Sequence, residues 1–467
     1  MTFLFALLIL KNMKTYDMTE GNPFRLIIFY SLPMLIGQVF QQLYSMCDTV
    51  IVGRLLGSSA LGAVGNTGPM NFLVLGFLFG MTSGFAVITA QRFGAKDEAG
   101  LKKSVAQNIL LNAASAVVIT ILACAFTKPI LRAIHTPEGS FFNDSFNYIF
   151  IIYAGIPALV LYNGCACVLR AVGDSKTPLY FLIVSSFLNI VLDIVFIKYC
   201  GMGVGGAAFA TVISQGVSGI LSLLWIIIKF PSLHVKLSDF NGGRQFMMRH
   251  LTIGLSMGFQ FSITAIGVVV LQGALNLFGE VKISAYTAAQ KVEQLVTVAA
   301  GVIGTTMTTY AGQNLGAGRI DRIREGVTKS TIISVSFAVL AAVLALLLSD
   351  QMTAIFIDRN EAGMTAEKWA EILKSSATYL KICGLNFPVL FVLFIYRNTL
   401  QGVNRGFWPL MGGVFELVAR TVAAYTLPSV LGYAGICAAG PIAWAAAAIP
   451  LAFACYIQLY SKKHPLV

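Results

Sequence analysis

Four carboxylates stand inside segments that are otherwise apolar, and these residues are the best placed in the chain to do chemistry. They are Asp48, Asp193, Glu293 and Glu416. An acid at the centre of a bilayer costs about 2.5–3.5 kcal/mol on insertion scales, so it is rare unless it binds an ion, a proton or a basic partner. We therefore treat these acids as candidate site residues and ask which elements position them.

Asp48 has polar neighbours at helical spacing. Gln41, Tyr44 and Asp48 fall on one face of a helix, which predicts that this face points into a wet interior. Pro33 lies in the same predicted helix, where its missing N–H permits bending. The alternative is that Asp48 is simply hydrated at the outer membrane interface.

Asp193 also belongs to a polar group. Asn189 stands four residues before it and shares its helix face. Thr211 follows a tight glycine turn that would fold the next helix back against this one. Carboxylate, amide and hydroxyl oxygens suit Na⁺ or a shared proton, although a structural hydrogen-bond network would use the same residues.

The two remaining acids have different surroundings. Glu416 and Arg420 are four residues apart in the favourable order, which predicts an intrahelical ion pair that hides two charges. Lys291 and Glu293 are two residues apart, so they point in different directions and need not pair. Glu293 is therefore a candidate for lining a cavity.

The composition identifies the class of protein. Of 467 residues, 57% are hydrophobic and 11% charged, whereas a soluble domain averages about 25% charged residues. This charge deficit excludes an ordinary soluble enzyme, a disordered chain and a nucleic-acid binder. The eight cysteines contain no Cys-x-x-Cys pair, and neither a phosphate-binding loop nor a transition-metal motif occurs. We predict a polytopic helical membrane protein that is not an enzyme and has no cofactor.

Twelve continuous apolar runs are long enough to span a bilayer as helices, and their lack of strict alternation excludes membrane β-strands. The predicted spans are 26–50, 60–89, 105–127, 142–168, 179–199, 206–230, 250–276, 284–311, 330–349, 376–400, 409–430 and 436–460. With both termini in the cytoplasm, the inside segments carry 21 Lys and Arg and the outside loops carry 8. This bias predicts that orientation.

The chain repeats itself. Gln91–Ala95 after the second span matches Gln313–Ala317 after the eighth, and Leu169–Pro178 after the fourth matches Leu400–Pro409 after the tenth. Two halves of six spans each have the same orientation, so an axis along the membrane normal relates them. We predict an N-terminal extension at 1–19, an N-lobe at 20–230, a cytoplasmic linker at 231–248 and a C-lobe at 249–467. Met1, Met13 and Met18 are possible starts, and residues 1–12 are expected to be dispensable.

Several of these motifs resemble those of one transporter family. Ser31–Gly37 and Cys47–Gly53 resemble the first helix of the MATE (multidrug and toxic compound extrusion) transporters. The loop motifs, Asn189-x-x-x-Asp193 and Gly205–Thr211 are similar too, and the resemblance covers roughly residues 20–460. It implies two six-helix lobes around a central cavity, alternating access, and export driven by a Na⁺ or H⁺ gradient in a bacterial plasma membrane.

The resemblance also implies site residues. Asp48, Asn189, Asp193 and Thr211 look like the family's N-lobe cation site, and they would be metal ligands if Na⁺ is the coupling ion. Pro33 resembles a first-helix proline that bends when the site is protonated. The chain departs from branches with acids in spans seven and ten, because it has Gln260, Gln272, Asn386 and Asn398 there. A C-lobe cation site of that kind is not expected.

The predicted function is that of an ion-coupled antiporter for amphiphilic drugs or toxic compounds, which we expect to be cationic. The residues predicted to line its substrate cavity are Gln41, Tyr44, Asn163, Gln260 and Glu293. Small molecules and membrane lipid are its expected partners, nucleic acid is not, and we expect a monomer. The alternative is a lipid-linked saccharide flippase of a related two-lobe fold, which would need a basic cavity to hold pyrophosphate.

Overall fold

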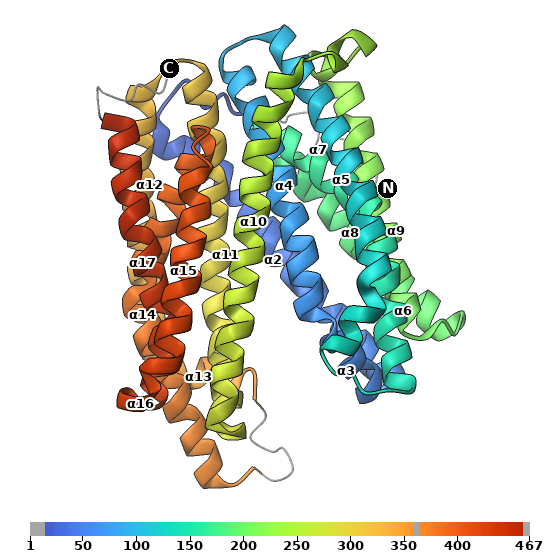
Figure 1. Ribbon diagram of the computed structural model, residues 1–467, viewed down its shortest axis with the longest axis vertical. Coiled ribbons are helices and arrows are strands. Elements are labelled where there is room, and N and C mark those ends of the chain that lie inside the picture. Colours follow the sequence, from blue (N-terminus) through green and yellow to red (C-terminus); the bar gives the residue numbers. More distant parts are fainter. Residues whose placement is uncertain (1–14, 358–363, 461–467) are drawn as a thin grey trace. The chain divides into compact units, whose positions relative to one another are not determined.

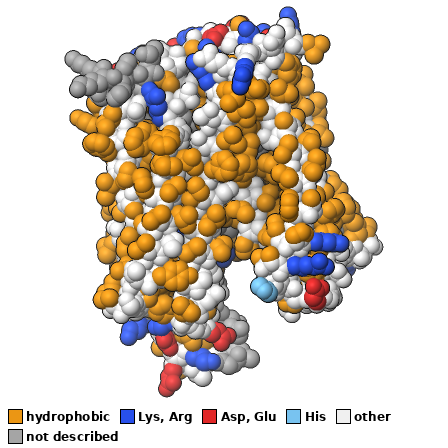
Figure 2. Space-filling view, in the orientation of Figure 1, with side chains coloured by type: hydrophobic (Ala, Val, Ile, Leu, Met, Phe, Trp, Pro, Cys, Tyr) orange, Lys and Arg blue, Asp and Glu red, His pale blue; other side chains and the backbone are white. Residues whose placement is uncertain are grey.

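The computed structural model describes residues 15–357 and 364–460. All regular elements in these ranges are helices, which confirms the predicted all-α membrane fold. Eleven helices are long and apolar enough to cross a membrane. A twelfth span results if α6 and α7, which are bent by 46° at their junction, are counted together. Figure 2 shows apolar side chains along the flanks of the helices and charged ones gathered near their ends.

The helices follow one another with short connections (Figure 1). The first nine elements are α2 (Pro23–Leu56), α3 (Ser58–Asn66), α4 (Gly68–Gly94), α5 (Glu98–Ala133), α6 (Ser140–Ala154), α7 (Ile156–Ala171), α8 (Lys176–Ile194), the π-helical turn η1 (Val195–Tyr199) and α9 (Gly203–Lys229). The rest are η2 (Pro231–Leu233), η3 (Leu237–Phe240), α10 (Arg244–Leu275), η4 (Asn276–Phe278), α11 (Glu280–Gly316), α12 (Ile320–Leu347), α13 (Ser349–Ala354), α14 (Ala366–Gly402), α15 (Phe407–Thr426), α16 (Pro428–Leu431) and α17 (Tyr433–Tyr460).

The chain divides into two compact units. The first consists of Met1–Gly21 and Ile28–Gly258, and the second of Asn22–Ile27 and Phe259–Val467. In the first unit α7 packs against α4, α5 and α9, while α8 packs against α9. In the second unit α14 packs against α11, α12 and α17. The division falls within α10, beyond the expected linker at 231–248, so the domain boundaries given above remain a prediction.

Two boundaries differ from the sequence prediction. The expected span 60–89 is two helices, because α3 ends at Asn66 and α4 begins at Gly68 with Pro69 in its first turn. The count of inside Lys and Arg took 397–408 as a cytoplasmic segment, although the predicted span runs to 400 and α14 continues to Gly402. Arg397 is consequently a buried helical residue and not a loop cation.

The repeated sequence motifs are helix C-caps. After α4 and α11, Lys96 (φ 54°) and Gly318 (φ 70°) occupy equivalent left-handed positions. After α7 and α14, Gly173 (φ 88°) and Asn404 (φ 64°) do the same. Each left-handed residue is followed by an N–H that donates back to the helix, as in Asp174 to Leu169 and Arg405 to Leu400. These are Schellman-type ends, for which glycine and asparagine are suited. The repeat is therefore visible in the backbone as well as in the sequence.

The short loop between α4 and α5 is held by Asp97. Its carboxylate accepts the N–H of Gly100 at 2.8 Å and pairs with Arg92 at 3.0 Å. An acid at a helix N-terminus satisfies free N–H groups and favours the helix dipole. Asp97 is thus the N-cap of α5, and Glu98 is the acidic residue of its first turn.

Residues just before α2 pack onto the loop between α7 and α8. The N–H of Tyr16 donates to the carbonyl of Gly173 at 3.0 Å, and its ring meets that of Tyr30 at 6.5 Å. Met18 is fully buried. A start at Met18 would remove Tyr16 and these contacts, whereas a start at Met13 would keep them. The segment 1–12 lies outside the described residues.

The helices α4 and α10 cross at their glycines within the first unit. A Cβ on Gly84 would lie 2.6 Å from the Cα of Gly254, and one on Gly80 would overlap the backbone at Met257 and Gly258. Each helix has its glycines four residues apart, so both present a smooth strip. Such strips let two backbones approach closely in a membrane.

A buried hydrogen-bond chain joins the same two helices through α5. Asn108 donates to Thr89 at 2.8 Å, the hydroxyls of Thr89 and Ser104 are 3.0 Å apart, and Ser104 lies 2.9 Å from Nε2 of His250. The Nδ1 of His250 is 3.0 Å from the carbonyl of Phe246. Because that carbonyl only accepts, Nδ1 carries the hydrogen. In the neutral imidazole Nε2 is then the acceptor for the Ser104 hydroxyl.

We expect Gly84→Ala to lower the free energy of unfolding by about 1–3 kcal/mol, as for other overpacked contacts. The added Cβ meets backbone atoms of α10, which cannot rotate away. Gly65→Ala in α3 is the matched control, because nothing lies within 4 Å of a Cβ there. Thermal unfolding of both purified variants in detergent measures the difference, and equal melting temperatures would contradict the close crossing.

Candidate functional site

Two membrane-embedded carboxylates face each other in the first unit. Asp48 on α2 interacts directly with Asp193 on α8. The side chain of Asp193 has no solvent exposure, and its two oxygens and Oδ1 of Asp48 are buried without a hydrogen-bond donor. None of the ion pairs formed by the described residues includes either acid. Two carboxyl groups are thus held together, and neither has a basic partner among the described residues.

Asn189 and Thr211 complete this group of oxygens. Asn189, one turn before Asp193, is 1% exposed and donates its amide N–H to the hydroxyl of Thr211 on α9 at 3.4 Å. Its carbonyl oxygen is buried and has no donor. The π-helical turn η1 begins two residues after Asp193, and such turns are frequent at functional sites. The predicted N-lobe residues therefore lie on three adjacent helices.

The donors that this group offers are all oxygens. A buried carboxyl oxygen without a donor is satisfied by a proton or by a hard cation, and Na⁺ prefers such ligands. The residues present therefore fit either coupling ion. Within the described part of the chain, no cluster of three or more His, Cys, Asp or Glu residues has the arrangement needed to hold a metal ion.

Two neighbours of the aspartates were not predicted as site residues. Tyr148 on α6 is buried and lies within electrostatic range of both Asp48 and Asp193. Gln215 on α9 hydrogen-bonds Tyr44, which belongs to the polar face of α2. Gln215 stands one helical turn after Thr211, so helical spacing could have found it. Tyr148 gave no such signal, because it is one of several aromatic residues in an apolar helix.

The residues predicted to line a cavity have varied roles. Gln41 and Tyr44 are half-buried on the Asp48 face of α2. Asn163 is buried and donates to the carbonyl of Leu159 on its own helix at 2.9 Å. Gln260 is 5% exposed and accepts a hydrogen bond from Gln401 at 2.7 Å. No finding tests whether these residues contact substrate, so that assignment stays a prediction.

Glu416 lies in a buried ionic triad. Its two oxygens accept from Arg420 on the same helix and from Arg397 on α14, each at 2.7 Å. The side chains of all three residues are 6–7% exposed. The predicted pair with Arg420 is therefore present, and Arg397 is an additional partner that the sequence prediction placed in a loop.

Glu293 has a different partner. The hydroxyl of Tyr379 on α14 donates to its Oε2, and Thr297 lies 3.5 Å from Oε1. Lys291 is exposed, and no ion pair between it and Glu293 occurs in the described structure. The prediction that these two side chains point in different directions is consistent with this arrangement.

The comparison with known families now gives the identity of the fold. The MatE family model matches residues 33–195 and 253–426, one segment in each half of the chain. The chain belongs to the MATE family. The family model matches each half of the chain once, and each repeated helix C-cap also occurs once in each half.

Known relatives of this MATE chain support the assignment. It is 29% identical over 379 residues to the probable multidrug resistance protein YpnP of Bacillus subtilis, covering 80% of this chain and 83% of that one. It is 24% identical over 386 residues to the probable multidrug resistance protein NorM of Thermotoga maritima, covering 81% and 79%. A solved outward-facing multidrug resistance MATE transporter of the MOP superfamily has a TM-score of 0.87 at 24% identity, covering 97% of this chain and 100% of its own.

These findings confirm the family that the motifs resembled and the multi-pass helical fold of this MATE transporter. Members of the family are carriers and not enzymes, and multidrug resistance is the function that the names of these relatives state. The flippase alternative is not favoured by any of these comparisons.

Proposed function

We propose that this MATE transporter is a secondary antiporter, which exports amphiphilic cationic compounds in exchange for H⁺ or Na⁺ by alternating access. The observation that carries the proposal is the pair Asp48 and Asp193. Two facing carboxylates inside a membrane helix bundle, without a basic partner, form a site that must bind a positive charge to be neutralised. A structural role would not require both acids.

The exchange follows from competition for this negative charge. A cationic substrate is held while Asp48 and Asp193 are ionised. A cation that enters from the outer side binds the same carboxylates, so the substrate loses its counter-charge and leaves. Two acids this close titrate as a coupled pair, and one bound proton or Na⁺ removes most of their repulsion.

Pro33 supplies the proposed link from ion binding to shape. It lies inside α2, the helix that carries Asp48, and deprives that helix of one backbone hydrogen bond. Neutralising Asp48 would change how the later part of α2 is held against α8, and a proline is where a helix bends most easily. We further propose a monomer in the plasma membrane with both termini in the cytoplasm, as the charge bias predicts.

A lipid-linked saccharide flippase would need a cavity with free basic groups. Arg397 and Arg420, both buried within the second unit, are bound by Glu416. Asp48 and Asp193 make the surroundings of α2 and α8 acidic. Both observations favour a cationic substrate over a pyrophosphate.

Transport by the purified protein in proteoliposomes tests the function. We impose an H⁺ gradient and a Na⁺ gradient in separate experiments. We expect one of these two gradients to be sufficient to drive a fluorescent lipophilic cation against its own concentration gradient. A membrane potential of ~150 mV supplies about 3.5 kcal/mol per charge, which sustains a concentration ratio of two to three decades. Accumulation that needs neither ion gradient would overturn the proposal, and so would transfer of a lipid-linked saccharide in place of the cation.

A further inference from the structure

The second unit contains a polar stripe that is separate from the two aspartates. On α11, Lys282, Tyr286 and Glu293 lie within about 40° of one another around the helix, since successive residues turn by about 100°. Lys282 and Glu293 are about 16 Å apart along the helix axis at 1.5 Å per residue. This distance is about half the ~30 Å thickness of a hydrocarbon core. The stripe therefore runs from one end of the helix to a depth near the middle of a membrane.

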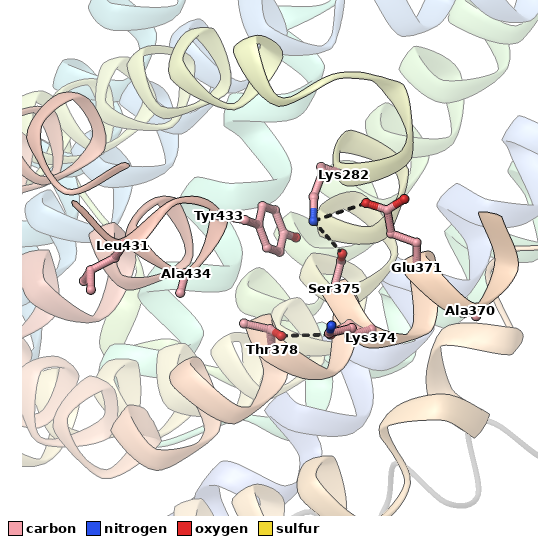
Figure 3. Close-up of a pocket in the computed structure, with 9 residues that line it drawn as sticks. All are labelled: Lys282, Ala370, Glu371, Lys374, Ser375, Thr378, Leu431, Tyr433 and Ala434. Atoms are coloured by element: carbon pink, nitrogen blue, oxygen red, sulfur yellow. Dashed lines mark hydrogen bonds and ion pairs between the residues drawn. The ribbon is translucent and has the colours of Figure 1, made fainter. Parts of the chain in front are cut away.

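The end of the stripe at Lys282 opens into a cavity of about 510 Å³ (Figure 3). Lys282 points into it and lies 3.3 Å from Glu371 and 3.4 Å from the hydroxyl of Ser375. The Lys282 ammonium also lies 5.0 Å from the centre of the Tyr433 ring. Thr378 lines the same cavity one turn further along α14. Charged and hydroxyl groups on three helices thus surround a space that water can enter.

Hydroxyl and thiol groups continue from the cavity into the protein. Tyr433 lies beside Cys437 on α17, and its ring forms part of the wall of the cavity. Deeper, the rings of Tyr286 and Tyr379 meet edge to face at 4.6 Å and their hydroxyls are hydrogen-bonded. The hydroxyl of Tyr379 donates in turn to Glu293. Each of these groups can both give and accept a hydrogen bond, as a proton relay requires.

Glu293 ends the stripe as a carboxylate without a cation. The groups that face it are Tyr286 on its own helix, Tyr379 and Cys383 on α14, and Arg420 on α15, while Cys437 on α17 lies next to Cys383. Arg420 is the basic group among them, and Glu416 already binds its guanidinium at 2.7 Å. The hydrogen bonds that this carboxyl group accepts come from hydroxyl groups, and Arg420, which Glu416 binds, acts on it only through its charge, so a proton is the simplest group that neutralises it in place.

We propose that the second unit has a proton-binding site of its own at Glu293, with Tyr379 as its hydrogen-bond partner, and that protons reach it from the cavity beside Lys282, Ser375 and Tyr433. A proton that arrives at the oxygen of Tyr286 lets this residue pass its own hydrogen to Tyr379. Tyr379 then passes its hydrogen to the carboxylate. One proton is moved, the carboxylate becomes a carboxylic acid and both tyrosines end neutral. The site is independent of the proposal for Asp48 and Asp193.

Infrared spectroscopy of the full-length protein, with both Asp48 and Asp193 replaced by Asn, tests the site. We expect this background to show the carbonyl band of a protonated carboxylic acid, which disappears as the pH is raised. Glu293→Gln should remove the band. Tyr379→Phe should shift it, since the acid loses a hydrogen bond while the ring still packs against Tyr286. Tyr425→Phe is the control, because that side chain is 57% exposed and lies outside the stripe, and it should leave the band in place.

A band that persists in Glu293→Gln would overturn the site, and so would a background without any pH-dependent band. Thermal unfolding of each variant separates these outcomes from loss of fold. The measurement does not depend on transport, so it stands even if the aspartate pair proves not to couple export to an ion gradient.

The route is tested by labelling Thr378→Cys, which places a thiol on the cavity wall. A membrane-impermeant maleimide added outside intact cells should label this variant well above the parent chain, whose own thiols provide the background. Labelling of the variant no greater than that of the parent, from either side of the membrane, would overturn the route.

Discussion

Asp48→Asn and Asp193→Asn should each abolish gradient-driven export. Asparagine keeps the shape of aspartate but cannot bind a proton or balance a cation, so the ion and the substrate no longer compete for one charge. The accumulation ratio of a lipophilic cation should fall from two to three decades, the value allowed by about 3.5 kcal/mol, to near one. Proteoliposomes with imposed H⁺ or Na⁺ gradients measure this ratio.

The fold should survive both substitutions. Each removes a carboxyl group that has no basic partner and at least one buried oxygen without a hydrogen-bond donor, and hence a desolvation cost, so the melting temperature should not fall. Asp321→Asn is the matched control, since Asp321 is 65% exposed and pairs with Arg319 outside the spans. Its export should equal that of the parent chain. Full coupled export by both aspartate variants would show that the N-lobe pair does not carry the coupling.

Glu416→Gln should have the opposite profile and mainly destabilise the protein. Glu416 is the shared partner of two buried arginines, and its replacement leaves both guanidinium groups without a carboxylate. Breaking a buried ionic group by removing one partner costs about 3–5 kcal/mol. Thermal unfolding in detergent should show a large fall in melting temperature.

The triad offers a second variant that keeps this prediction falsifiable. Replacing Glu416, Arg397 and Arg420 together by methionine removes the three buried charges of the triad, and such replacements are often neutral or stabilising. The triple variant should therefore unfold at a higher temperature than Glu416→Gln. If Glu416→Gln is as stable as Asp321→Asn, whose ion pair is exposed, the triad does not hold α14 to α15 in the way described.

Helical periodicity was sufficient for contacts within one helix. The shared face of Asn189 and Asp193 and the pair Glu416–Arg420 followed from a spacing of four residues, because one turn brings these side chains together. The number of spans followed from their length, and the all-helical fold from their unbroken apolar runs. The repeated motifs were found because helix C-caps need particular residues at particular positions.

Contacts between residues that lie far apart in the sequence could not be predicted from helical spacing. The approach of Asp48 to Asp193 came only from the family resemblance, since 145 residues separate them in the chain. Tyr379 and Glu293 were not linked because nothing in an apolar helix marks one tyrosine as a donor to another helix. Arg397 was counted as a loop cation although it lies within the predicted span 376–400, and α14 continues through Gly402.

The glycine crossing of α4 and α10 combines a backbone contact with interlocked side chains, and this combination fixes the angle between the two helices. Where side chains interlock, helices can sit only at certain angles, and moving from one angle to another means repacking. Gly80 and Gly84 lie against the backbone of α10, but side chains of α4 cover the glycines of α10: Phe85 lies over Gly254, and Phe77 and Met81 lie over Gly258. A change of crossing angle would therefore require these side chains to repack. The hydrogen bonds from Asn108 to His250, each worth about 1 kcal/mol net, add to the resistance against such a change.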